Sequence, residues 1–229
     1  MNDPKIIVAL DFDNEIEVFQ LVDQLDPNLC RLKIGKELFT ACGPTIVKKV
    51  QDRGFDVFLD LKFHDIPATV AKACAAAANL GVWMLNVHAL GGREMLKAAR
   101  AAIDEAENSP HLIAVTLLTS FDQIQLNEIG IKVDLAEEVN NLAALVKSTG
   151  VDGVVCSGWE AQSLKQICGE NFLLVTPGIR PEGSQNNDQK RIMTPKMALD
   201  NGASYLVIGR PITRSVNPLE SLQLIHKSI

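Results

Sequence analysis

Residues 57–81 have the sequence VFLDLKFHDIPATVAKACAAAANLG. The segment opens with an apolar run, Val57–Leu61, which is typical of a buried strand. Asp65 and Pro67 then favour the start of a helix, because Asp caps the first turn and Pro is tolerated there. The alanine-rich stretch that follows predicts a helix over Ala68–Leu80, with a glycine directly after it as a stop signal. This segment therefore predicts one strand followed by one helix.

The same order of strand and helix recurs along the whole chain. Short, continuous apolar runs predict eight buried strands, at Ile6–Leu10, Leu29–Ile34, Val57–Leu61, Met84–Val87, Leu112–Leu118, Gly153–Cys156, Leu173–Thr176 and Tyr205–Ile208. Helical patterns lie between and after them, at Ile16–Leu25, Glu37–Arg53, Ala68–Leu80, Arg93–Glu107, Leu135–Thr149, Glu160–Ile167, Pro195–Asn201 and Pro218–Ser228. Continuous rather than alternating apolar runs indicate parallel strands that are covered on both faces.

Eight strand–helix units fit the length of the chain. With 229 residues, each unit has close to the roughly 30 residues of a βαβ unit. We therefore predict an α/β fold in which residues 1–229 form one domain, a single (β/α)8 TIM barrel. An open, doubly wound sheet is the alternative, because periodicity alone does not show that the sheet closes.

Composition excludes several classes of protein. Hydrophobic residues make up 47% and charged residues 22%, which is ordinary for a globular protein. The net charge of −6 gives no basic excess for binding nucleic acid or an anionic membrane. No apolar stretch approaches the roughly 20 residues of a membrane span, and no secretion signal is visible. Five cysteines without a CxxC motif and four scattered histidines predict a reduced, cytoplasmic protein without a dedicated metal site.

Charged residues follow several of the predicted strands, at the end of a barrel where active sites lie. Asp11 ends the first strand, Lys33 lies in the second, and Asp60, Lys62 and Asp65 follow one another in and after the third. Residues two apart in a strand face the same way, so Asp60 and Lys62 should point together, either into the barrel mouth or outward. Each lysine taken alone has a bland alternative, a solvated side chain.

An alternating array of carboxylates and ammonium groups suits a particular chemistry. At about 4 Å and an effective dielectric constant near 20, each contact between opposite charges contributes about 4 kcal/mol. Such contacts keep the lysines charged and hold a fixed negative charge beside the substrate. The array therefore fits a reaction in which a carboxylate leaves and a carbanion develops.

The end of the eighth strand resembles an anion site. Gly209 allows backbone N–H groups to approach a phosphate, and Arg210 offers a bidentate fork. Arg180, Gln189 and the long loop Gly178–Arg191 after the seventh strand can close over the same anion. The alternative is a glycine turn beside a solvated arginine.

Six stretches of the chain form one pattern: Val8–Asp11, Lys33–Gly35, Phe58–Pro67, Val175–Pro181, Asp188-Gln189 and Val207–Ile212. Together and in this order, between residues 8 and 216, they resemble one known family, the orotidine 5′-phosphate decarboxylases of the bacterial type. The DxKxxD motif formed by Asp60, Lys62 and Asp65, together with Lys33 on the preceding strand, is specific. The GxR phosphate loop alone is not.

The resemblance implies a reaction and a role for each residue of the array. Members of the family convert orotidine 5′-monophosphate to uridine 5′-monophosphate, the last step of pyrimidine nucleotide synthesis, without a metal or organic cofactor. By resemblance, Lys62 protonates carbon 6 as carbon dioxide departs, and Asp60 lies near the scissile carboxylate. Lys33 links the array to the ribose, and Asp11 also binds ribose hydroxyls.

The resemblance also implies a homodimer with two shared active sites. Asp65 and Ile66 would enter the site from the neighbouring subunit. Thr69 and Pro177 are also expected to bind the nucleotide. Thr119 and Ser120 lie where the family reads the pyrimidine. The residues expected to hold the phosphate are Arg180, Gln189, Gly209 and Arg210.

Two rival functions are weighed against this one. Magnesium-dependent sugar-phosphate decarboxylases or synthases of the same wider group share the DxKxxD strand, but they carry an acidic metal ligand on the second strand, where this chain has Lys33. The other rival is a non-catalytic nucleotide-binding protein on a decayed barrel. Loss of Asp60 or Lys62 would favour it, and this chain has both.

Overall fold

The structure is a computed structural model that describes residues 3–181 and 193–229. The described residues contain eight parallel strands, and all eight predicted strands are found with small changes at their ends. The strands are β1 (Ile6–Leu10), β2 (Cys30–Gly35), β3 (Val57–Phe63), β4 (Met84–His88), β5 (His111–Val115), β6 (Gly153–Val155), β7 (Leu173–Thr176) and β8 (Tyr205–Ile208).

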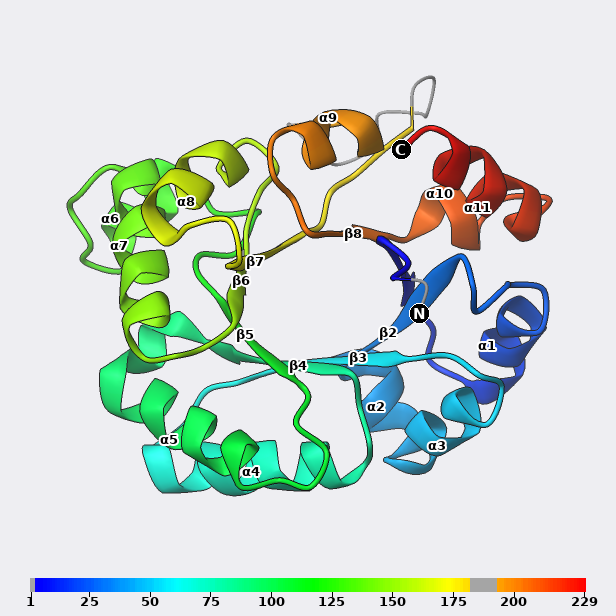
Figure 1. The fold of residues 1–229 in the computed structure, drawn as a ribbon, viewed down its shortest axis with the longest axis horizontal. Coiled ribbons are helices and arrows are strands. Elements are labelled where there is room, and N and C mark those ends of the chain that lie inside the picture. The colour runs from blue at the N-terminus through cyan, green and yellow to red at the C-terminus, as the bar shows by residue number, and fades with distance from the viewer. Residues whose placement is uncertain (1–2, 182–192) are drawn as a thin grey trace.

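The strands close into a barrel with the order β1 to β8, and helices surround it (Figure 1). Closure is made by β1 and β8, which pair in parallel from Ile6 opposite Leu206 to Val8 opposite Ile208. The predicted (β/α)8 TIM barrel is therefore confirmed, and the open doubly wound sheet is wrong. Among the described residues, no helix is long and apolar enough to cross a membrane.

Most helices lie where the sequence predicts them. They are α1 (Glu15–Val22), α2 (Lys36–Cys42), α3 (Thr45–Gln51), α4 (Pro67–Asn79), η1 (Ala89–Gly91), α5 (Gly92–Asp104), α6 (Gln123–Glu128), α7 (Leu135–Ser148), α8 (Ala161–Cys168), α9 (Pro195–Asp200), α10 (Arg210–Thr213) and α11 (Pro218–Lys227). The short helices η1, α6 and α10 were not predicted.

Two details of the predicted helices are wrong. The single helix over Glu37–Arg53 is two helices, α2 and α3, because Gly43 adopts a φ of 71° and Pro44 follows it. Asp65 does not cap α4. Pro67 favours an extended preceding residue, so the cap position falls on Ile66, which has a ψ of 151°. The Asp65 carboxylate instead accepts a hydrogen bond from the Ile66 backbone N–H at 2.6 Å.

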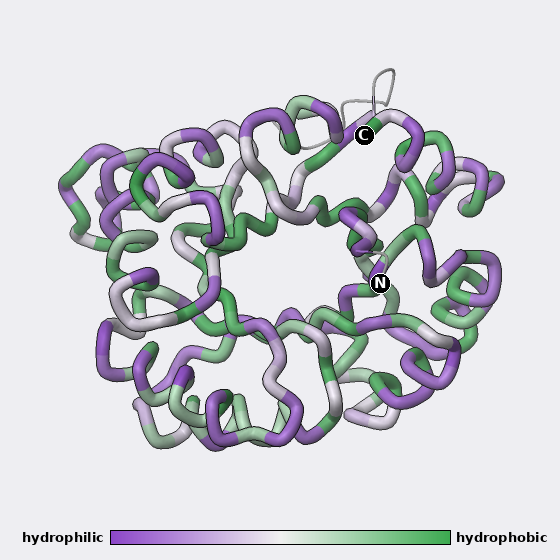
Figure 2. The backbone as a smooth tube through the Cα atoms, viewed as in Figure 1, coloured by the Kyte–Doolittle hydropathy of each residue, from purple (hydrophilic) through white to green (hydrophobic). Residues whose placement is uncertain are grey.

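Apolar side chains form two layers of core. The larger layer lies between the strands and the surrounding helices, and the smaller one fills the barrel with residues such as Ile7, Phe58, Met84 and Ile113. Figure 2 shows the ring of strands as mostly hydrophobic and the outer helices as mixed. Because apolar side chains fill the interior, the barrel is a packed core and a site forms only at an end.

A cationic side chain closes the N-terminal end of the barrel. The Arg31 guanidinium lies 4.0 Å from the centroid of the Trp83 ring and also faces the Tyr205 ring. It forms ion pairs with Asp3 at 2.9 Å and Asp56 at 3.2 Å, and only 6% of Arg31 is exposed. This end is therefore sealed, and the opposite end of the barrel is left for a site.

The pairing of β3 with β4 is irregular next to that opposite end. Phe58 pairs with Met84 and Leu59 with Leu85, but Val87 then pairs with Phe63, two residues later in β3 than a regular ladder requires. Lys62 lies inside this bulge with a φ of 52°, the one non-glycine positive φ in the described ranges. Asp60 and Lys62 do point to the same side, but the bulge, and not the simple alternation of a strand, aims them.

Candidate active site

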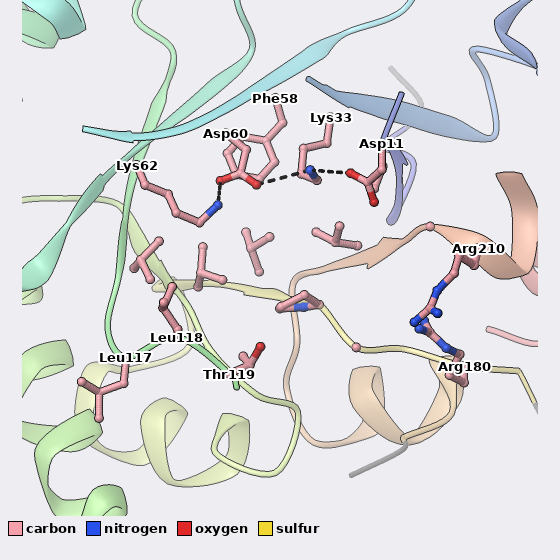
Figure 3. A pocket seen from close by; sticks show the side chains of 18 residues that line it. Asp11, Lys33, Phe58, Asp60, Lys62, Leu117, Leu118, Thr119, Arg180 and Arg210 are labelled. Atoms are coloured by element: carbon pink, nitrogen blue, oxygen red, sulfur yellow. Dashed lines mark hydrogen bonds and ion pairs between the residues drawn. The ribbon is translucent and has the colours of Figure 1, made fainter. Parts of the chain in front are cut away.

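A cavity of about 330 Å³ lies at the C-terminal ends of the strands (Figure 3). Its floor is apolar and consists of inward-facing residues such as Ala9, Phe58, Val155 and Val175. Charged side chains from β2 and β3 and the loop after β1 line one wall, and arginines that follow β7 and β8 line the other. The cavity therefore has one wall of mixed charge and one cationic wall.

The wall of mixed charge is a continuous chain of ion pairs. The Lys33 ammonium lies 3.5 Å from Asp11 Oδ1 and 3.3 Å from Asp60 Oδ2, and the Lys62 ammonium bonds to Asp60 Oδ1. Lys33 is only 9% exposed, whereas the Asp11 side chain is 67% exposed. The predicted array Asp11–Lys33–Asp60–Lys62 is thus assembled in one place, as Figure 3 shows.

The charges around Asp60 keep its carboxyl group ionised. Burial by itself raises the pKa of Asp60, but Lys33 and Lys62, together with hydrogen bonds from Lys62 and Asn86, lower that pKa below its ordinary value. Buried charges are tolerated only when they are paired in this way. The site therefore presents a fixed carboxylate between two ammonium groups.

Asn86 is a polar residue of the site region that the sequence reasoning missed. Its side chain is fully buried in β4. Its amide nitrogen donates to Asp60 Oδ1 at 2.8 Å, and its amide oxygen accepts from the backbone N–H of Lys62 at 2.8 Å. The available signal was a lone amide inside the apolar run Met84–Val87, because buried polar groups need hydrogen-bond partners.

The cationic wall comes from the loops after β7 and β8. Arg210 is the first residue of α10, directly after Gly209, and Arg180 lies beyond β7. Both guanidinium groups lie at the edge of the cavity (Figure 3). The backbone N–H of Arg180 donates to the Met193 carbonyl at 3.0 Å, which fixes the loop after β7 to the start of the next segment. Two guanidinium forks that line the same cavity suit a phosphate group.

The predicted site residues separate into two groups. Those that line the cavity are Asp11, Lys33, Asp60, Lys62, Thr119, Pro177, Arg180, Gly209 and Arg210. Those that do not line it are Asp65, Ile66, Thr69 and Ser120, all exposed. Gln189 and most of the predicted loop Gly178–Arg191 lie outside the described residues.

Two histidines stack at the rim of the cavity, beside the wall of mixed charge. The His64 and His88 rings lie 5.2 Å apart and 20° from parallel. Burial, together with the nearby charges of His64, Lys36 and Lys62, lowers the pKa of His88 to about 4. His88 is therefore neutral at neutral pH, and its Nδ1 accepts from the Leu90 N–H at 3.5 Å. In the part of the chain that the structure describes, no three His, Cys, Asp or Glu residues gather to hold a metal ion.

Comparisons with known proteins agree with one another. Residues 4–225 match the model of the orotidine 5′-phosphate decarboxylase / HUMPS family. The chain is 59% identical over 223 residues to an orotidine 5′-phosphate decarboxylase of Saccharophagus degradans, covering 97% of this chain and 94% of that protein. It is 58% identical over 229 residues to the Nitrosospira multiformis protein of the same name, covering 100% and 95%. A crystal structure of orotidine 5′-phosphate decarboxylase from Lactobacillus acidophilus superposes with a TM-score of 0.87, at 41% identity and 98% coverage of both chains.

Proposed function

The chain belongs to the orotidine 5′-phosphate decarboxylase / HUMPS family, and on that premise we propose that it decarboxylates orotidine 5′-monophosphate to uridine 5′-monophosphate. It is an enzyme of the carboxy-lyase class, and its relatives carry the name of this activity. The observation that carries the proposal is the paired array Lys33–Asp60–Lys62 opposite the two arginines. One wall can act on a carboxylate while the other holds a phosphate.

In the proposed reaction, Lys62 supplies a proton to the pyrimidine ring. The bond between carbon 6 and the carboxylate breaks, carbon dioxide leaves, and the electron pair stays on carbon 6. The Lys62 ammonium stabilises this developing charge and donates its proton there, and the lysine is afterwards reprotonated from water. Asp60 accepts a hydrogen bond from the Lys62 ammonium and orients it.

Binding of the rest of the nucleotide is proposed to use the remaining cavity residues, together with Ser120, which does not line the cavity, and Gln189, which lies outside the described residues. Lys33 and Asp11 would bond ribose hydroxyls, and Thr119 and Ser120 would contact the pyrimidine. Arg180, Gln189, Gly209 and Arg210 would hold the phosphate, with Pro177 beside them. Binding energy gained at the phosphate, remote from carbon 6, assists catalysis when it closes and orders the site.

The proposed active unit is a homodimer. Asp65, Ile66 and Thr69 lie outside the cavity of their own chain, at an exposed surface beside it, and Ile66 is 66% exposed. An exposed isoleucine next to a charged residue of the motif supports the proposal that this segment enters the site of a partner subunit. A cytoplasmic location is proposed with it, supported by five cysteines that are all free of disulfides.

The reaction is proposed to need no metal. A magnesium-dependent relative would carry an acidic ligand at the position of Lys33. A buried ammonium at that place repels a divalent cation, and it is already engaged by Asp11 and Asp60.

The test is the ultraviolet absorbance of orotidine 5′-monophosphate mixed with the purified protein and EDTA. Loss of the substrate band is the expected result. An unchanged band with folded protein, together with magnesium-dependent consumption of a sugar phosphate in a separate assay, would instead support a sugar-phosphate decarboxylase or synthase. Binding of uridine 5′-monophosphate without any turnover would support a binding protein.

Variants test the individual roles. Lys62→Ala should abolish turnover but leave binding of uridine 5′-monophosphate measurable, and near-normal activity would remove Lys62 from its role. Arg210→Ala should chiefly weaken phosphate binding, and an unchanged affinity would remove Arg210 from the site. Mixing inactive Asp65→Ala chains with inactive Lys62→Ala chains should restore one intact site per heterodimer. Failure to recover activity would contradict the shared site.

A further inference from the structure

We infer that Asn86 is a positioning residue for the decarboxylation, acting through Asp60 and Lys62. The inference rests on the proposed function of these two residues. Asn86 does not line the cavity. Its amide nevertheless bonds the carboxylate of one charged residue and the backbone of the other, at 2.8 Å each.

The need for Asn86 comes from the irregular pairing of β3 with β4. In a regular ladder Val87 would pair with Leu61, but it pairs with Phe63, so β3 contains two more residues than its neighbour between the paired positions. A bulge of this kind interrupts the ladder and leaves backbone groups without their usual partners. The Lys62 N–H finds its acceptor in the Asn86 side chain, so the amide replaces the missing backbone bond.

Lys62 is held in an unusual backbone conformation at this point. Its φ of 52° lies in the left-handed region, which residues with a side chain rarely adopt and which persists only when the surroundings enforce it. The hydrogen bond from its N–H to Asn86 is one such constraint. Without it, the bulge is free to relax, and the start of the Lys62 side chain moves with the backbone.

The chemistry of the amide explains why asparagine suits this position. An amide has both a donor and an acceptor, and Asn86 uses the donor on the Asp60 carboxylate and the acceptor on Lys62. Leucine has the same branched shape and the same number of side-chain heavy atoms but neither function. An ionised aspartate can still accept from Lys62, but it cannot donate and it repels Asp60.

Loss of this contact should act on the rate and not on binding. Asp11 and Arg210, which are proposed to bind the ribose and the phosphate, follow β1 and β8, whereas Asn86 lies in β4, so we expect them to stay in place. Misplacing a reacting group by roughly 1 Å costs on the order of 100-fold in rate. A displaced Lys62 ammonium therefore lowers kcat while the affinity for the product remains.

The experiment compares the intact protein with Asn86→Leu and with a control, Thr116→Val. Thr116 is also fully buried, and its hydroxyl bonds to the Val155 carbonyl, away from the charged array. For Asn86→Leu we expect kcat to fall about 100-fold, with the Kd of uridine 5′-monophosphate changed by less than about threefold and the control near the unmodified protein. A kcat per folded site within threefold of that protein would overturn the inference.

A second variant keeps the inference testable if Asn86→Leu does not fold. In Asn86→Asp, activity relative to the unmodified protein should rise as the pH falls from 8 to 5, because a protonated carboxyl regains the donor toward Asp60. The other charged or titratable groups nearby, Asp60, Lys33, Lys62, His64 and His88, are present in both proteins, so the ratio reports on the change at position 86. A ratio that does not change with pH would contradict the inference. An unmodified protein without decarboxylase activity would refute the proposed function itself.

Discussion

Replacing Lys33 by methionine tests how much the ion pairs of the charge array contribute to the free energy of unfolding. The Lys33 ammonium lies 3.3 Å from Asp60 and 3.5 Å from Asp11, and at an effective dielectric constant near 20 each attraction amounts to about 5 kcal/mol before desolvation. Asp11 is largely exposed and contributes little. Removing one partner of a buried pair costs about 3–5 kcal/mol, because the other charge stays buried. Since Lys62 still pairs with Asp60, we expect Lys33→Met to lower the free energy of unfolding by about 3 kcal/mol at pH 7.

Urea denaturation of a double-mutant cycle measures this effect. In an Asp60→Asn background no buried carboxylate is left unpaired, so Lys33→Met should cost about 2 kcal/mol less there than it does alone. The pH gives a second check. The lowered pKa of Asp60 contributes stability above its unfolded pKa of 3.8, and that stability is lost as the pH falls through the lower folded pKa. Lys33→Met raises the pKa of Asp60 in the folded protein. The difference in the free energy of unfolding between the two proteins should therefore narrow as the pH falls toward 4. A loss below about 1 kcal/mol at pH 7, or equal losses in both backgrounds, would refute the reasoning.

Three further predictions concern residues outside the array. Arg31→Met should lower the free energy of unfolding by about 2–3 kcal/mol in urea denaturation, a modest loss because both carboxylate partners of Arg31 are half-exposed. Because Arg31 lies at the sealed end of the barrel, kcat per folded protein should be unchanged, and a reduced kcat would contradict this. Gly153→Ala would place a Cβ 2.1 Å from the Leu173 carbonyl oxygen, so a loss of about 3 kcal/mol or more is expected, and a melting temperature like that of the unmodified protein would show that this contact relaxes. His88 has a pKa of about 4 in the folded protein against 6.5 when unfolded, so it lowers the free energy of unfolding as the pH falls from 6.5 toward 4. His88→Gln should make stability less dependent on pH in this range, and an unchanged slope would show that other groups cause the pH dependence.

The barrel was predictable because its strands are buried on both faces. Runs such as Ile6–Leu10 and Tyr205–Ile208 are apolar throughout and match the structure at both ends. The prediction failed where a helix is short and mostly polar. Helix α6 has only Leu126 buried, so it shows no apolar stripe, although the capping box of Asp122 with Gln125 marks its start.

The site was predictable where charge stands out against an apolar strand. Lys33, Asp60 and Lys62 interrupt buried runs, and such charges need partners, which the sequence supplies at the same end of the barrel. Asn86 was missed because its function depends on a neighbouring strand being two residues longer, and register is a property of the pair and not of either sequence. The positive φ of Lys62 was invisible for the same reason.

The uneven register between β3 and β4 also bears on how this barrel can be stabilised by design. Deleting two residues from the bulge would let the ladder continue without interruption, relieve the left-handed Lys62 and remove the need for a buried amide. Selection for thermal tolerance alone would favour such a barrel, and it would be inert. Protein engineers who seek a more robust catalyst should therefore treat the seam between these strands as fixed and place stabilising substitutions elsewhere, for example at the sealed end.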